Sequence, residues 1–185
     1  MHIPKNILIL GAGQAGAFAA SEIRKHNKEI KISIFSNETY LPYERPPLSK
    51  DNIMGKKNYD ELEFFSSDFY DKENIKIVNA TVKEVDFKKK TIITDDDNFE
   101  IYDSLLIATG SKNKKLHFGE DKEDINQSIL YLRNIEESKT IKEAIDTHNS
   151  FAVVGGGFIG LEIASSIAQL GKVAHIIEMG SHLMG

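Results

Sequence analysis

The pattern of apolar and polar residues in the N-terminal part of the chain predicts a strand, a helix and a second strand. Residues 7–10 form an unbroken apolar run that ends in glycine, which is typical of a buried parallel strand. Residues 14–26 are rich in alanine with apolar side chains at helical spacing, and residues 32–35 form another short apolar run. Because two parallel strands need a crossover connection, usually a helix, the chain is expected to open with α/β architecture.

The same pattern returns toward the C-terminal end. Residues 151–154 predict a buried strand, residues 158–170 a helix that stops at Gly171, and residues 173–178 a second strand. A helix over residues 136–148, which we expect to be exposed, precedes them. The chain therefore contains one weak internal repeat of strand, glycine-rich turn, helix and strand.

The region between the repeats predicts loops and a small antiparallel sheet. Residues 41–50 contain three prolines, so we expect a rigid loop without regular structure. Residues 113–124 are polar and predict a linker, which places the domains at residues 1–113 and 114–185. The other expected elements are a helix at 67–73 and strands at 76–78, 81–86, 90–94, 99–102 and 105–108. The fold class is α/β: a Rossmann-like domain with a small antiparallel β-meander, then an incomplete second Rossmann-like domain.

Composition narrows the classes of function. The net charge is -5 and the basic residues form no long block, which argues against nucleic acid as a partner. No apolar run approaches the roughly 20 residues that span a bilayer, and the N-terminal residues leave no room for a signal peptide. We therefore expect a cytoplasmic protein without a membrane partner. The chain has no cysteine, and its histidines lack the spacing of metal ligands, so we expect no disulfide chemistry and no metal site.

The two glycine-rich turns carry the chemistry. Residues 11–16 (GAGQAG) and 155–160 (GGGFIG) both place a G-x-G-x-x-G spacing between a predicted strand and a predicted helix. In this motif the first glycine permits a sharp turn, the second admits a pyrophosphate and the third allows close packing of helix and strand. The free N–H groups of the helix then favour phosphate. One such motif often marks a structural turn only, but two in matching contexts predict two dinucleotide sites.

An acidic residue after the second strand should bind the ribose hydroxyls of each nucleotide. Glu178 lies 18 residues after Gly160, and its carboxylate would repel the extra phosphate of NADP, which favours NAD. In the first repeat the equivalent place is predicted to be Asn37 or Glu38.

These motifs, together with the loop PYERPPLSK (residues 42–50) and Ala108-Thr109-Gly110, resemble the FAD-dependent ferredoxin reductases. That family includes the putidaredoxin, rubredoxin and dioxygenase-system reductases and is related to apoptosis-inducing factor. The resemblance covers nearly the whole chain. It implies FAD on the first turn, NAD(H) on the second, and a small iron–sulfur protein, a ferredoxin or rubredoxin, as partner.

The resemblance also assigns residues. It implies Arg45 near the FAD pyrophosphate, Lys50 near the flavin ring, the Val82 backbone at the adenine, and Arg133 as a further flavin-nucleotide contact. Lys112 stands where many relatives have arginine. The cofactor-binding residues implied by motif and resemblance are Gly11, Gly13, Gln14, Ala15, Gly16, Asn37, Glu38, Arg45, Lys50, Val82, Ala108, Thr109, Gly110, Arg133, Gly155, Gly157, Phe158, Ile159, Gly160 and Glu178.

The catalytic pair implied by the resemblance is Lys50 and Glu162, on the first turn of the second repeat's helix. Buried together, the two charges would offset each other's desolvation, and their meeting would join the two domains at the reaction centre. A cation near the flavin would also favour its reduced form. Without the resemblance, two solvated surface charges would be the ordinary interpretation.

Other residues fit a structural role. His175 lies among apolar strand residues and is expected in the core, as are Phe64, Phe65, Phe69 and Tyr70. Ser49 has no histidine and aspartate context that would make it a nucleophile.

The chain stops at Gly185, whereas members of the resembling family continue well beyond the corresponding point. We therefore expect an exposed sheet edge and apolar face, either covered by a second copy in a homo-oligomer or left poorly ordered. Because the absent part of the resembling family normally contacts the ribityl chain and flavin, we also expect weakened FAD binding or an apo protein. The leading hypothesis is a fragment of an NADH-dependent ferredoxin or rubredoxin reductase. The alternative is a truncated, catalytically inactive nucleotide-binding module. A disulfide reductase is excluded for this segment because it needs a redox cysteine.

Overall fold

The computed structural model describes residues 3–116, 118, 125 and 127–184, and its chain divides into two compact units. The first unit comprises residues 1–44 and 63–111, and the second comprises residues 45–62 and 112–185. Among the described residues, every helix is too short or too polar to cross a membrane. Most of the predicted linker, residues 117 and 119–124, lies outside the described residues.

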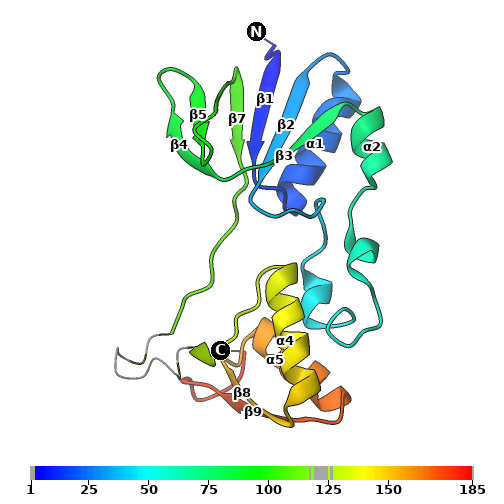
Figure 1. Ribbon diagram of the computed structural model, residues 1–185, viewed down its shortest axis with the longest axis vertical. Coiled ribbons are helices and arrows are strands. Elements are labelled where there is room, and N and C mark those ends of the chain that lie inside the picture. Colours follow the sequence, from blue (N-terminus) through cyan, green and yellow to red (C-terminus); the bar gives the residue numbers. More distant parts are fainter. Residues whose placement is uncertain (1–2, 117, 119–124, 126, 185) are drawn as a thin grey trace. The chain divides into compact units, whose positions relative to one another are not determined.

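A parallel sheet forms the centre of the first unit, as the α/β prediction requires. Its strands lie in the order β3 (Ile75–Asn79), β2 (Lys31–Ser36), β1 (Asn6–Leu10) and β7 (Ser104–Ile107), and each neighbouring pair is parallel (Figure 1). Helix α1 (Gln14–His26) connects β1 to β2, and the short helix α2 (Ser67–Lys72) precedes β3. The long apolar runs therefore form the interior strands β1 and β2.

Alternating side chains of β1 divide the first unit into two apolar cores. Ile7 and Ile9 pack on the face that also contains Ala20 of α1 and Tyr70 of α2. Leu8 and Leu10 pack on the opposite face. Because successive strand residues point to opposite faces, an unbroken apolar run is needed where both faces are covered.

A three-stranded antiparallel sheet covers the second face. Its strands β4 (Val82–Asp86), β5 (Thr91–Thr94) and β6 (Phe99–Ile101) lie in sequence order, and Ile92 of β5 is fully buried against Leu8 and Leu10. This sheet is the predicted β-meander. The α/β fold class with its parallel and antiparallel sheets is therefore confirmed.

The second unit packs two helices against one face of a two-stranded parallel sheet. The sheet contains β8 (Ser150–Val154) and β9 (Val173–Ile177), and the helices are α4 (Ile135–Thr147) and α5 (Phe158–Gln169). A core of five isoleucines joins them: Ile53, Ile141, Ile145, Ile163 and Ile167.

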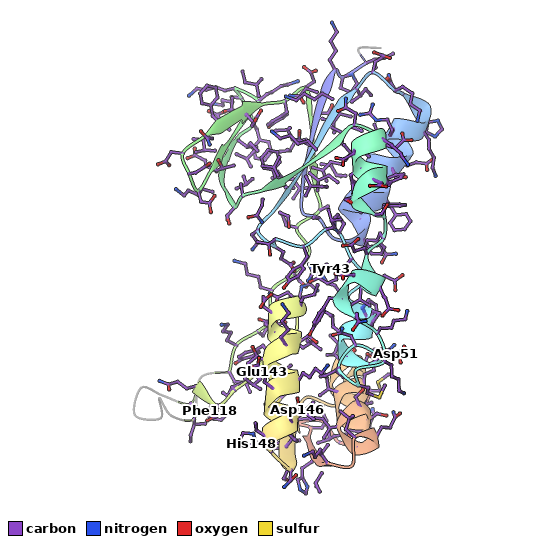
Figure 2. All side chains as sticks on the ribbon, turned by 45° about the vertical axis from the view of Figure 1, so that its right-hand side comes forward. Tyr43, Asp51, Phe118, Glu143, Asp146 and His148 are labelled. Atoms are coloured by element: carbon purple, nitrogen blue, oxygen red, sulfur yellow. The ribbon has the colours of Figure 1, made fainter. Side chains whose placement is uncertain are left out.

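Helix α4 differs from the expected exposed helix because one side of it is buried, including Ile141 and Ile145. It begins after Asn134, whose side chain accepts a hydrogen bond from the Glu137 N–H at 2.9 Å, and it ends before His148 (Figure 2). Polar residues at most of its other positions concealed this apolar stripe.

The proline-rich loop contains a 3₁₀ helix, η1 (Pro46–Ser49), and a second one, η2 (Tyr59–Leu62), follows. The expectation that the prolines forbid regular structure is wrong here. Proline is tolerated in the first turn of a helix, where its missing N–H has no partner to lose, and Pro46 and Pro47 occupy that position.

The other face of the β8–β9 sheet is exposed within the part of the unit that the structure describes. Val154, Val173 and Ile177 are each more than half exposed on it, as expected for an uncovered apolar face. His175 lies on this face too and is exposed, so its expected core position is wrong. Because successive strand residues point to opposite faces of a sheet, His175 faces away from the helices, while its neighbour Ala174 is partly buried and packs against them.

Replacement of Tyr70 by phenylalanine is expected to raise the free energy of unfolding by up to about 1 kcal/mol, because it removes a buried polar group that lacks a partner. The Tyr70 hydroxyl is buried without a hydrogen-bond partner among the described residues, and burial raises the pKa of this hydroxyl so that it stays protonated. Urea unfolding measures the difference. The matched control is Tyr43→Phe, which removes a 2.5 Å bond to Glu38 and should destabilise by about 1 kcal/mol. Equal losses from both variants would contradict this assignment.

Candidate functional site

The first glycine-rich turn leaves β1 and enters α1 through a backbone that only glycine adopts freely. Gly11 has φ +108°, and its N–H donates to the Phe35 carbonyl of β2 at 2.9 Å. At Gly16 an added Cβ would lie closer to the Gly11 carbonyl oxygen than real Cβ atoms ever do. At Gly13, in contrast, an added Cβ would meet nothing within 4 Å among the described residues. The middle glycine therefore borders open space, while the first and third build the turn.

The second glycine-rich turn repeats this geometry. Gly155 has φ +105°, and its N–H donates to the Ile177 carbonyl of β9 at 2.9 Å. An added Cβ at Gly160 would collide with the Gly155 carbonyl oxygen, and one at Gly157 would meet nothing within 4 Å among the described residues. The two turns are therefore built alike, although they belong to different units.

Both turns present helix N-termini that suit an anion. Gly13 and Gly157 are the N-cap residues of α1 and α5, with nearly identical backbone angles (φ -79° and -80°, ψ -174° and -176°). Within the described chain no side chain caps either helix, and neither first turn contains an acidic residue. The first N–H groups of a helix lack intrahelical partners, and the helix dipole favours negative charge there. The open space at the middle glycine and these amides fit a dinucleotide pyrophosphate.

The remaining predicted residues of the two turns lie in the first turns of the helices. Gln14 and Ala15 are exposed at the start of α1. Phe158 and Ile159, at the start of α5, are 73% and 59% exposed, which is unusual for large apolar side chains. These residues therefore line the outside of the two turns, where an approaching ligand would meet them.

Glu178 follows β9 directly and its carboxylate accepts the backbone N–H groups of Gly156 at 2.6 Å and Gly180 at 2.8 Å. These two hydrogen bonds, that of Gly180 being the larger cause, lower the pKa of Glu178. The second turn therefore has a carboxylate anion held at its edge by two backbone N–H groups. Gly156 was not among the predicted residues, yet a side chain there would collide with Leu183 and approach Glu178.

The strand registers correct the equivalence between the two repeats. Leu10 pairs with Phe35 as Val154 pairs with Ile177, so the position that matches Glu178 is Ser36. The prediction had placed it at Asn37 or Glu38. Ser36 lies 20 residues after Gly16 and Glu178 lies 18 residues after Gly160, so only the strand register, and not a count from the glycines, identifies the matching position. Asn37 and Glu38 follow just beyond, and Glu38 accepts the Tyr43 hydroxyl at 2.5 Å; Tyr43 is labelled in Figure 2.

Lys50 and Glu162 meet as predicted, with Lys50 Nζ 3.0 Å from Glu162 Oε1. Two expectations about them are wrong. The side chains are 47% and 29% exposed rather than buried, and both residues belong to the second unit, so the pair does not join two compact units. Segment 45–62 packs with α4 and α5, which no local pattern indicates. Glu162 is also the fifth residue of α5, just past its first turn.

Ser49 supplies a further contact that the sequence did not indicate. Its hydroxyl donates to Glu162 Oε2 at 2.6 Å, and this bond is the largest cause of a lowered pKa at Glu162, ahead of the opposing desolvation and the Lys50 interaction. Ser49 lacks the context of a nucleophile, and the structure shows it instead as a hydrogen-bond donor to the Glu162 carboxylate.

The other predicted residues divide between the units. In the second, Arg45 Nη1 donates to the Arg133 carbonyl oxygen at 2.5 Å, so the structure brings these two together, and Lys112 is exposed. In the first, Ala108 lies directly against Gly11, and Thr109 and Gly110 follow it at the surface, with Gly110 at φ +69°. Val82 begins β4 beside a break in strand register. In the part of the chain that the structure describes, no group of acidic or histidine side chains could hold a metal ion.

Two strand–glycine turn–helix–strand repeats with one geometry define a Rossmann-like α/β protein. The chain belongs to the pyridine nucleotide-disulphide oxidoreductase family, whose model matches residues 5–185. Members of this family use FAD and NAD(H).

Proteins named as ferredoxin or rubredoxin reductases share this segment. The chain is 34% identical over 186 residues to the probable ferredoxin reductase CtmF of Castellaniella defragrans, covering 100% of this chain and 44% of the relative. It is 32% identical over 179 residues to rubredoxin-NAD(+) reductase of Pseudomonas putida, covering 96% and 46%. The crystal structure of the covalent putidaredoxin reductase–putidaredoxin complex matches with a TM-score of 0.84 and 28% identity, covering 94% of this chain and 42% of that chain. The chain thus spans less than half the length of these relatives.

Proposed function

We propose that the first unit binds FAD at residues 11–16 and the second binds NAD(H) at residues 155–160, as part of an NADH-dependent ferredoxin or rubredoxin reductase. The observation that carries this proposal is the matched geometry of the two turns, each with open space at its middle glycine. NADH would pass a hydride to FAD, and the electrons would leave one at a time to a small iron–sulfur protein.

The relatives support the chemistry and the partner class. Their names give NAD(+) as a substrate and ferredoxin, rubredoxin or putidaredoxin as the acceptor, and one relative was crystallised joined to putidaredoxin. When bound, FAD supplies the ability to take two electrons and release them singly. The contribution of the chain is to hold and orient the two nucleotides.

Residues of the first unit would hold the pyrophosphate of FAD. Gly13 and the α1 amides would bind it, with Ala108-Thr109-Gly110 beside them. The family resemblance also assigns Arg45, Arg133 and Lys50 to the flavin nucleotide; within the second unit Arg45 donates to the Arg133 carbonyl oxygen and Lys50 pairs with Glu162.

Glu178 would select NAD over NADP. Its carboxylate is fixed at the end of β9 by two backbone N–H groups, beside the turn where the ribose of the adenosine would lie. A fixed anion repels the 2′-phosphate of NADP.

Two alanine variants test the assignment of nucleotides to turns. Gly13→Ala should weaken FAD binding by about one to two orders of magnitude and leave NADH binding unchanged, because a methyl group displaces phosphate from hydrogen bonds worth about 1.5–3 kcal/mol. Gly157→Ala should do the reverse. Fluorescence titration of the purified chain with each nucleotide measures both, and each variant is the control for the other. Equal effects of both variants on both nucleotides would contradict the assignment.

Anaerobic mixing with NADH then separates reductase from binding module. Bleaching of the flavin absorbance in the FAD-loaded protein, followed by reduction of an added ferredoxin or rubredoxin, supports the proposal. Tight binding of both nucleotides with no hydride transfer would instead select the inactive nucleotide-binding module.

A further inference from the structure

We propose that Ser49 is a positioning residue that fixes Glu162 as a permanent anion, so that Glu162 holds Lys50 in place and does not itself exchange a proton during the reaction. The inference rests on the proposed function for its consequence at the flavin. It rests on the geometry of the second unit alone for the contact itself.

Both oxygens of the Glu162 carboxylate are engaged by neighbouring residues of one short segment. Oε2 accepts the Ser49 hydroxyl at 2.6 Å, and Oε1 lies 3.0 Å from Lys50 Nζ. A carboxylate held through both oxygens has a fixed orientation, and protonation would remove one of the two acceptors. The arrangement therefore favours a structural anion over a proton donor.

The Ser49 hydroxyl has one hydrogen to donate and two acceptors within reach. Glu162 Oε2 is at 2.6 Å and the Pro46 carbonyl oxygen at 3.1 Å. Because hydrogen bonds to charged acceptors are shorter and stronger, the Ser49 hydroxyl donates its hydrogen to Glu162 and not to the Pro46 carbonyl oxygen.

Buried hydroxyls from both helices hold the segment that carries Ser49. The Ser49 carbonyl oxygen accepts the Ser166 hydroxyl of α5 at 2.7 Å, and Ser166 is 2% exposed. From α4, the fully buried Ser138 hydroxyl lies 3.1 Å from Asn52 Oδ1 and 3.4 Å from the Leu48 carbonyl oxygen. Ser49 itself is only 4% exposed. The position of its hydroxyl is therefore set by the core of the unit and not by solvent.

Few charges compete for Glu162. It is the only charged residue of α5, β8 has none, and the one titratable residue of β9, His175, is exposed on the outer face. On the segment around Ser49, Arg45 donates to the Arg133 carbonyl. On α4, Lys139 lies over the Tyr59 ring. Among the described residues Lys50 is the one charge with a resolved effect on the pKa of Glu162, and that effect ranks below the Ser49 bond.

The consequence for Lys50 follows from its exposure. A half-exposed lysine in a single ion pair is weakly ordered, because such exposed pairs contribute little to stability. Because Ser49 already holds the carboxylate of Glu162, less side-chain entropy is lost when Lys50 pairs with it. Ser49 therefore positions the Lys50 ammonium group through Glu162.

The test is the pKa of the Glu162 carboxyl, followed by carbon-13 NMR in the purified chain without nucleotide. We expect a pKa below the ordinary value in the native chain and an upward shift in Ser49→Ala. Ser49→Thr, which keeps the hydroxyl, should restore the low value. The control Ser165→Ala removes a hydroxyl from the exposed side of α5 and should change nothing.

The lowered pKa of Glu162 also makes the stability of the chain depend on pH. A carboxyl whose folded pKa is depressed contributes stability above its unfolded pKa, and this contribution is lost as the pH falls through the folded pKa. Ser49→Ala should therefore be less stable than the native chain at neutral pH, with the difference shrinking under acid conditions.

An ordinary Glu162 pKa in the native chain would overturn the proposal whatever the variants do. So would an unchanged pKa in Ser49→Ala. These measurements involve no flavin, so failure of hydride transfer with a normal Ser49 effect would count against the proposed function alone. In the FAD-loaded protein, Glu162→Gln should abolish the effect of Ser49→Ala on the rate of flavin reduction. Additive losses from the two changes would also overturn the proposal.

Discussion

Gly16→Ala is expected to destabilise the first unit by about 3 kcal/mol, although alanine is the better helix former by about 1 kcal/mol. Packing opposes the propensity at this position. An added Cβ would collide with the Gly11 carbonyl oxygen and lie 3.2 Å from both the Gly11 carbonyl carbon and Ile9 Cγ2. These are backbone atoms of the turn and a side chain of the central strand, and neither can move without shifting β1 or α1. Chemical denaturation followed by circular dichroism measures the loss.

Gly13→Ala is the matched control, since the same methyl group points into open space three residues earlier. Its cost should stay below about 1 kcal/mol, the difference between glycine and alanine at an N-cap. Loss of nucleotide binding without loss of stability is therefore expected at Gly13, and loss of both at Gly16. A Gly16→Ala variant as stable as the native chain would show that the turn is looser than the structure indicates.

Arg24→Met is expected to reduce the free energy of unfolding by about 2–4 kcal/mol. Arg24 lies on α1 and is 2% exposed. Its guanidinium group donates to four backbone carbonyls, those of Asn27, Lys28, Ile30 and Asn74. Methionine fills a similar volume but leaves these carbonyls without their donor, and the bond to Ile30 is fully buried. The guanidinium group thus connects the end of α1 to the chain entering β2 and to the turn before β3.

Two further variants isolate this effect. Lys25→Met makes the same kind of change one residue along, at a side chain that is 67% exposed, and should alter stability by no more than about 0.5 kcal/mol. Arg24→Lys keeps the charge but not the planar set of donors, and should give an intermediate loss. Equal stability of Arg24→Met and Lys25→Met in urea titrations would show that water replaces the guanidinium group at no cost.

The elements and the turns of the two repeats follow from local features of the sequence. The apolar runs of β1 and β8 and the spacing of their glycines act over a few neighbouring residues, because strand alternation and the left-handed backbone of Gly11 and Gly155 are local properties. Their strand–turn–helix geometry was therefore predictable. The Lys50–Glu162 contact was predictable only through the family resemblance, since no local pattern relates residues 112 positions apart.

The way in which those pieces combine depends on long-range packing, which the structure shows. The register of β2 on β1 made Ser36 the counterpart of Glu178, and the packing of segment 45–62 on α4 and α5 placed the Lys50–Glu162 pair within one unit. The same packing brought the Ser49 hydroxyl to Glu162 across 113 positions. Such contacts depend on long-range burial, which a hydroxyl or a charge in the sequence does not reveal because its favoured partner there could equally be water.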